Sequence, residues 1–274
     1  MLASITEGPW SRLDVDFLER TVRALMAIGG AQLRGLGHIL VAGSPFHLHP
    51  LVTLLRGVAE AMGWVWWLSA PILPDPAEGV DISAPEWLTR AKRVVDRSQL
   101  HHLEELALRR ARREASKGKG SEEYQQVDRQ IGALKEHFSR LHGHDASLSG
   151  KRRTWRIGQE TIPKKTDLVI AVTEYAHGER YRGSGLNPYR LYSGYAHASV
   201  EIVFAHQTGT TTAPLSALIV GDEDEVKSVV GAALRTFAVG HELALHMFGM
   251  EMAPLREWEG RVDSLILERP ESDH

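Results

Sequence analysis

Residues 85–116 read PEWLTRAKRVVDRSQLHHLEELALRRARREAS, and this stretch decides the fold class of the chain. It is rich in leucine and in charged residues, and it contains no glycine and no proline after Pro85. This composition favours a helix, because glycine and proline are the residues that interrupt one. Ser83 and Pro85 are typical of a helix start, so we predict one long amphipathic helix that ends near Ser116.

The residues that follow predict a second helix beside the first. Residues 117–120 contain two glycines and break the helical pattern. Ser121, followed by Glu122 and Glu123, has the pattern of a helix cap, and the helix that it starts should reach about Leu141. We therefore expect residues 85–141 to form a protruding helical hairpin with a polar tip.

Helical spacing of apolar residues also marks most of the remaining chain. The other expected helices span residues 14–36, 50–68, 166–175, 187–207 and 222–248, and a last one follows Pro254. The helix at 50–68 should be central, because it is apolar nearly all round. Residues 168–172 also fit a strand, and there we choose the helix. Residues 142–165 have no clear period and should be loop or extended chain.

We therefore expect an all-α protein, a helical bundle of about seven helices in a single domain that spans residues 1–274. The 274 residues are 43% apolar, which is enough to bury a sizeable core. The chain has no cysteine, which excludes disulfides, thiolate metal sites and cysteine nucleophiles and fits a reducing compartment.

Two segments bear on where the protein resides. Residues 1–10 lack the basic and then apolar order of a secretion signal. Arg56 and Glu60 interrupt the most apolar stretch, residues 52–68, which favours a core helix over a membrane span. We accordingly expect a cytoplasmic protein with no membrane partner.

The net charge of -3 conceals two local basic clusters. The first consists of Arg109, Arg110, Arg112, Arg113, Lys117 and Lys119, and the second of Lys151, Arg152, Arg153 and Arg156. Such clusters attract phosphate groups, and they also occur as ordinary solvated helix faces and loops. Both interpretations stay open at this point.

The most specific motif is YRLYSGYAH, residues 189–197. On a helix, one polar stripe holds the residues at i, i+3, i+4, i+7 and i+11, which are Arg190, Ser193, Gly194, His197 and Glu201. An arginine, a hydroxyl, an imidazole and a carboxylate on one stripe can bind and protonate an anionic group such as a phosphate. The alternative is a buried hydrogen-bond cluster that fixes the helix register.

Arg56 and Glu60 form a second candidate pair, four residues apart on the most apolar helix. Isolated charges there would be costly to desolvate, so we expect them to pair with each other or with partners across the core. His197 and Glu201 are the obvious partners. A cluster of these four residues would be either a structural network or the floor of a polar pocket.

Arg190, six intervening residues and His197 resemble the Arg-x4-6-His signature of the HEPN superfamily, all-helical proteins that include metal-independent ribonucleases and toxins. The chain is also similar to uncharacterised bacterial helical proteins with a Tyr-Arg-x-x-Ser-Gly-x-x-His string after an Arg-x-x-x-Glu helix like Arg56 to Glu60. The resemblance implies that His197 acts on the ribose 2′-hydroxyl or the leaving oxygen while Arg190 holds the phosphate, often across a dimer. Leu191 stands where the nuclease signature favours a polar residue, so an inactive relative stays an alternative.

Three functions therefore remain open, and the sequence does not decide whether the chain is an enzyme. The first is an RNA-directed HEPN-like protein, with Arg190 and His197 as catalytic residues and with Tyr189, Arg56, Glu60, Ser193 and Glu201 as binding residues. The second is a small-molecule enzyme or binder with a polar pocket between helices, and the third is a structural scaffold. The partner would be RNA or a small anionic ligand, and a homodimer is left open.

We expect no metal and no cofactor. His241 and His246 lie five residues apart, whereas the zinc-protease motif needs histidines four apart on one helix face.

Overall fold

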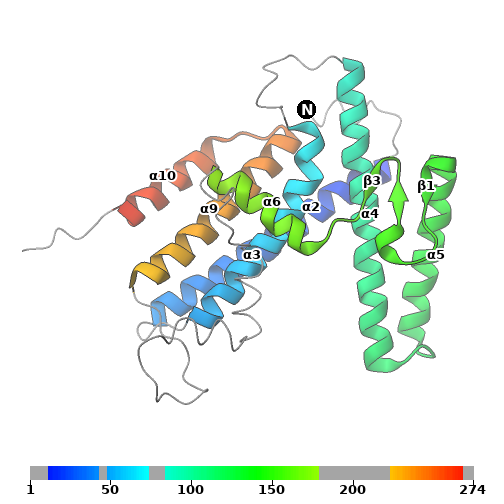
Figure 1. Ribbon diagram of the computed structural model, residues 1–274, viewed down its shortest axis with the longest axis horizontal. Helices are drawn as coiled ribbons and strands as arrows, with labels where there is room; N and C mark the ends of the chain where they lie inside the picture. The colour runs from blue at the N-terminus through cyan, green and yellow to red at the C-terminus, as the bar shows by residue number, and fades with distance from the viewer. Residues whose placement is uncertain (1–11, 43–47, 74–83, 179–222, 268–274) are drawn as a thin grey trace, which may run out of the picture. The chain divides into compact units, whose positions relative to one another are not determined.

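The computed structural model describes residues 12–42, 48–73, 84–178 and 223–267. This part of the chain holds seven α-helices, which are α2 (Arg12–Ala42), α3 (Leu48–Ser69), α4 (Ala84–Lys117), α5 (Glu122–His142), α6 (Lys165–His177), α9 (Glu223–Phe248) and α10 (Ala253–Leu267). One small sheet accompanies them (Figure 1). The predicted all-α fold class is therefore confirmed. The helix expected at 187–207 lies outside the described residues.

The predicted helical hairpin is confirmed as α4 and α5, which run side by side in opposite directions (Figure 1). Gly118, with a positive φ of 79°, follows α4 at the turn. Ser121 caps α5, because its hydroxyl oxygen accepts a hydrogen bond from the backbone N–H of Tyr124 at 3.3 Å. The short connection therefore has the turn chemistry that the sequence predicted.

The segment that fitted both a helix and a strand is helical in the structure, as α6. Its β-branched residues Val169 and Val172 are buried, so the helix uses them as core side chains. Gly63 of α3 allows α6 to approach closely, because a Cβ atom at position 63 would lie 2.9 Å from the carbonyl oxygen of Leu168. Tertiary packing accounts for a helix in this β-prone segment.

Residues 142–165 contain extended chain, as expected, and also a small antiparallel sheet. Its three strands are β1 (Ala146–Ser147), β2 (Arg156–Ile157) and β3 (Glu160–Thr161), in the order β1-β2-β3. Ile157 pairs with Ala146 on one side and with Glu160 on the other. Strands of two residues carry no measurable alternation, so the sequence pattern could not reveal this pairing.

The contacts divide the chain into two compact units. The first contains residues 1–23 and 67–164, and the second contains residues 24–66 and 165–274. The long helices α2 and α3 contribute residues to both units. This division does not test whether the chain is one domain, which stays a prediction.

The first unit is organised around α4. Residues 94–101 of this helix are all buried. Consecutive helical residues point in directions about 100° apart, so eight buried residues in a row mean that the helix is covered on every side at this level. The predicted helix is confirmed, but its middle is enclosed instead of having one buried and one solvated face.

The second unit is organised around α3, the helix predicted to be central. Gly57 lies against Gln32 of α2, and Met62 contacts Gly240 of α9. Together with the contact between Gly63 and α6, these positions place α3 among three helices. One buried apolar cluster of this unit consists of Leu36, Leu51, Val52, Leu55, Ala59, Val169, Val226 and Ala233.

One described helix is long and apolar enough to cross a membrane. The segment is Asp14–Ala42 in α2, and 17% of its most apolar window is buried. This helix meets a criterion of length and composition only. Core helices of soluble proteins and signal sequences meet the same criterion. Cytoplasmic location and the lack of a membrane partner stay expectations.

Candidate functional site

Most of the predicted site falls outside the described residues. This holds for the catalytic pair, Arg190 and His197, and for Tyr189, Ser193 and Glu201. Their placement on one polar stripe and their roles therefore stay predictions.

Arg56 and Glu60 pair with each other, which is one of the two arrangements that we expected. Nε of Arg56 donates to Oε1 of Glu60 at 2.8 Å, and the two side chains are 19% and 21% exposed. Lys165, at the start of α6, donates from Nζ to Oε2 of Glu60 at 3.1 Å. The Glu60 carboxylate therefore contacts two cationic side chains, one from its own helix and one from α6.

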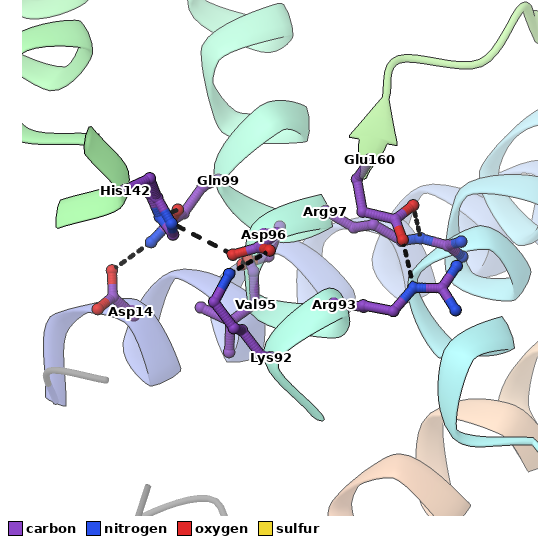
Figure 2. Close-up of polar contacts among 10 residues, drawn as sticks. Asp14, Lys92, Arg93, Val95, Asp96, Arg97, Gln99, His142 and Glu160 are labelled. Atoms are coloured by element: carbon purple, nitrogen blue, oxygen red, sulfur yellow. Dashed lines mark hydrogen bonds and ion pairs between the residues drawn. The ribbon is translucent and has the colours of Figure 1, made fainter. Parts of the chain in front are cut away.

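A chain of polar side chains crosses the first unit (Figure 2). The amide nitrogen of Gln99 donates to Oδ1 of Asp14 at 2.7 Å, and Nε2 of His142 lies 2.9 Å from the amide oxygen of Gln99. Because that oxygen can only accept, Nε2 of His142 carries a hydrogen. Asp96 continues the chain, with its Oδ1 3.8 Å from His142 Nε2 and its Oδ2 2.9 Å from Lys92 Nζ.

Burial is the largest influence on the pKa values of Asp96 and His142 in this series of polar side chains. It raises the pKa of Asp96, although the hydrogen bond and the charge of Lys92 act in the opposite direction. Burial also lowers the pKa of His142, which the nearby Asp96 opposes. Asp14 and Asp96 are each 2% exposed, so neither can meet a large substrate as the chain is folded. We therefore interpret these side chains as a link that joins α2, α4 and α5.

A second buried network surrounds Glu160 of β3 (Figure 2). Its two carboxylate oxygens each accept a hydrogen bond of 2.6 Å, from Nε of Arg93 and from Nε of Arg97. The Arg97 guanidinium also donates to the carbonyl of Trp67 and lies 5.2 Å from the centre of that indole ring. Burial lowers the pKa of Arg97, and the bond and charge of Glu160 oppose the shift. The network fixes the sheet on α4.

The sequence did not point to either network. The one available signal was the run of four polar residues, 96–99, inside a stretch that is otherwise patterned like an amphipathic helix. Such a run breaks the apolar spacing and suggests that polar groups are buried there. The partners Asp14 and Glu160 carried no signal of their own.

The described residues also form an open hollow along α4, which we call the α4 groove. Its volume is about 540 Å³, and its lining residues are His102, Glu105, Leu106, Arg109, Arg112, Arg113 and Ser116. These positions recur every three or four residues, so they share one face of the helix. The groove therefore lies on the part of α4 that follows the enclosed residues 94–101.

The arginines of the α4 groove differ from their neighbours in having no ion-pair partner within the described part of the chain. Arg109, Arg112 and Arg113 have no carboxylate within 4 Å among the residues that the structure describes. In contrast, Arg110 pairs with Asp128 at 2.5 Å. Three guanidinium groups and the single carboxylate of the lining, Glu105, leave a surplus of two positive charges.

At one end of the α4 groove, a lining histidine stacks on an aromatic ring. The imidazole of His102 stacks on the ring of Phe17, with centroids 4.6 Å apart and planes 28° apart. Burial lowers the pKa of His102, which keeps the ring neutral near pH 7. The groove can therefore offer fork-shaped donors for phosphate oxygens and a flat ring, a combination that suits an anion and disfavours a metal cation.

The fold and this surface define an all-α helical protein with an open basic groove along one helix. The chain matches no protein-family model, no curated protein and no solved structure with which it was compared.

Proposed function

We propose that the protein is an RNA-directed, HEPN-like helical protein that holds the phosphate backbone of RNA in the α4 groove. The observation that carries the proposal is a set of three guanidinium groups on one helix face, at Arg109, Arg112 and Arg113, which have no carboxylate partner among the described residues. Unpaired arginines that face solvent together repel one another, so an anionic ligand stabilises this arrangement.

The dimensions of the groove suit a polyanion better than a single small anion. Arg109 and Arg113 lie one helical turn apart, about 6 Å along the axis, and Ser116 lies about 10 Å from Arg109. Guanidinium groups spaced along a line can each bind a different phosphate of one strand. A small anionic ligand would occupy only part of this length.

In this proposal the chemical step belongs to Arg190 and His197. His197 takes the proton of a ribose 2′-hydroxyl, and the 2′-oxygen attacks the adjacent phosphorus while Arg190 holds the phosphate oxygens. The bond between phosphorus and the 5′-oxygen breaks, the protonated His197 returns its proton to that oxygen, and the products are a 2′,3′-cyclic phosphate and a free 5′-hydroxyl. An inactive relative would bind RNA in the same groove without this step.

The binding part is tested with a labelled single-stranded RNA of mixed sequence and fluorescence anisotropy at several salt concentrations. The wild-type affinity should fall as salt rises, and Arg109→Gln, Arg112→Gln and Arg113→Gln together should weaken it. Each phosphate contact of a single strand contributes about 0.7 to the steepness of log K against log salt. The slope of the triple variant should therefore be shallower than that of the wild-type protein by about 2.

The matched control neutralises three cations of the same hairpin that are already paired. Arg110, Lys117 and Lys119 have Asp128, Glu123 and Glu114 as partners. Their triple glutamine variant changes the net charge equally but should keep most of the salt slope. Equal losses in the two triple variants would contradict a specific role for the α4 groove.

The catalytic part needs a separate readout. Cleavage of the same RNA in the presence of a metal chelator should disappear in His197→Ala, while binding persists. Binding without any cleavage by the wild-type protein would identify an inactive relative. If the wild-type protein neither binds nor cleaves RNA, the proposed function is wrong.

A further inference from the structure

The second unit contains an apolar hollow that the RNA proposal does not use. It lies between α9 and α10 and their connection, and its volume is about 690 Å³. Phe237, His241 and Leu245 line it from α9 at one-turn spacing, and Trp258 lines it from α10. Small-molecule sites usually have volumes of about 300–1,000 Å³ and mostly apolar or aromatic walls, so this hollow has the size and the lining of one.

The walls of the hollow are aromatic and are held in place by one another. The ring of Phe237 meets the ring of His241 edge to face, with centroids 5.9 Å apart and planes 73° apart. It meets the indole of Trp258 in the same manner, at 6.3 Å and 69°. Met250 also lines the hollow and is 59% exposed, so a large apolar side chain stands in water at this place.

The charge of the residues that line the hollow determines which ligands with an apolar ring bind best. Glu251 is the only charged residue of the lining among the described residues, and no basic side chain there pairs with it. His241 is neutral near pH 7 because burial lowers its pKa. A carboxylate beside aromatic faces attracts a cation and repels an anion, since ring faces also favour positive charge.

We propose that this hollow binds an aromatic amine, a small molecule whose protonated amino group pairs with Glu251 while its ring packs against Phe237 and Trp258. The site lies in the unit that does not contain the α4 groove, and the inference does not depend on RNA binding.

The test uses the full chain and three probes that share a phenethyl group, which are phenethylamine, phenethyl alcohol and hydrocinnamate. Ligand-observed NMR or calorimetry at neutral pH should show binding of the amine about fivefold tighter than the alcohol, with the carboxylate weakest. Glu251→Gln should remove the advantage of the amine and leave the alcohol unchanged. Glu251 is exposed, so this variant should fold normally.

Glu257→Gln is the matched control, because Glu257 lies on α10 outside the lining and pairs with Arg261 at 3.1 Å. It should keep the advantage of the amine. Three outcomes would overturn the proposal: equal affinity of amine and alcohol, an advantage that survives Glu251→Gln, or no binding of any probe. If Met250→Ser instead abolishes self-association seen by sedimentation and no probe binds, the hollow is a contact between copies of the chain.

Discussion

His101 allows a quantitative test of the enclosed middle of α4. Its side chain is 5% exposed. Burial lowers the pKa of His101 from 6.5 to about 4, and the positive charge of a protonated His102 acts in the same direction. The folded protein therefore favours the neutral imidazole. The unfolded chain binds a proton near pH 6.5, so the free energy of unfolding falls as the pH drops from 6.5 towards 4.

The size of this effect follows from the shift in pKa. Each pKa unit is worth about 1.4 kcal/mol, so the full loss by pH 4 is about 3 kcal/mol. Between pH 7.5 and pH 5, where folding is easier to measure, His101 alone should cost about 2 kcal/mol of stability. Above pH 6.5 both states are mostly unprotonated, and this contribution does not change further.

Urea denaturation at several pH values measures the effect in the wild-type protein and in His101→Gln. The variant should be less stable at pH 7.5, since glutamine fills the site poorly, but its stability should fall by about 2 kcal/mol less down to pH 5. Other histidines with lowered pKa values, such as His142, His177 and His241, affect both proteins equally and cancel in the difference.

Parallel stability curves for the wild-type protein and His101→Gln would refute the reasoning. Such a result would mean that water reaches the imidazole, and hence that the middle of α4 is not enclosed on every side.

Two further predictions concern packing, and both are measured as free energies of unfolding in urea. Glu160→Gln should lower the stability by about 3–5 kcal/mol, because it leaves the buried Arg97 without its counter-charge. A stability equal to that of the wild-type protein would show that the network is dispensable. Gly63→Ala should cost about 1–3 kcal/mol, because a Cβ there meets the Leu168 carbonyl oxygen at 2.9 Å. Gly37→Ala, with nothing within 4 Å of the new Cβ, should instead gain up to about 1 kcal/mol, and equal effects at the two glycines would contradict the close approach of α3 and α6.

The parts of the fold that the sequence predicted are those set by local signals. Ser121 and the acidic residues after it place the start of α5 within one residue, because a cap acts on its own first turn. The proline-initiated start near Ala84 and the break after Lys117 similarly bound α4. The predicted helices at 50–68 and 222–248 are confirmed as α3 and α9, because a long apolar segment and acidic residues at a helix start are signals of the helix itself and not of its neighbours.

The parts that could not be predicted depend on partners far along the chain. Gln99 bonds to Asp14, 85 residues away, and no local pattern relates the two. Glu160 lies in a segment without periodicity, yet it is 4% exposed because two arginines of α4 neutralise it. Of the predicted site, Arg56 and Glu60 show one of the two arrangements that the sequence left open, since residues four apart on a helix are neighbours.

Partners far along the chain also explain why a count of basic residues does not locate the α4 groove. Arg97 and Arg109 lie on the same helix and look equivalent in the sequence, but Glu160 neutralises the first and no described carboxylate neutralises the second. The basic cluster predicted from the sequence likewise mixes Arg110, which is paired, with Arg112 and Arg113, which have no ion-pair partner in the ranges that the structure describes. Charge available to a ligand is what remains after the fold has formed its own ion pairs, so a variant series that removes only unpaired arginines tests phosphate binding, whereas one that removes Arg97 tests folding.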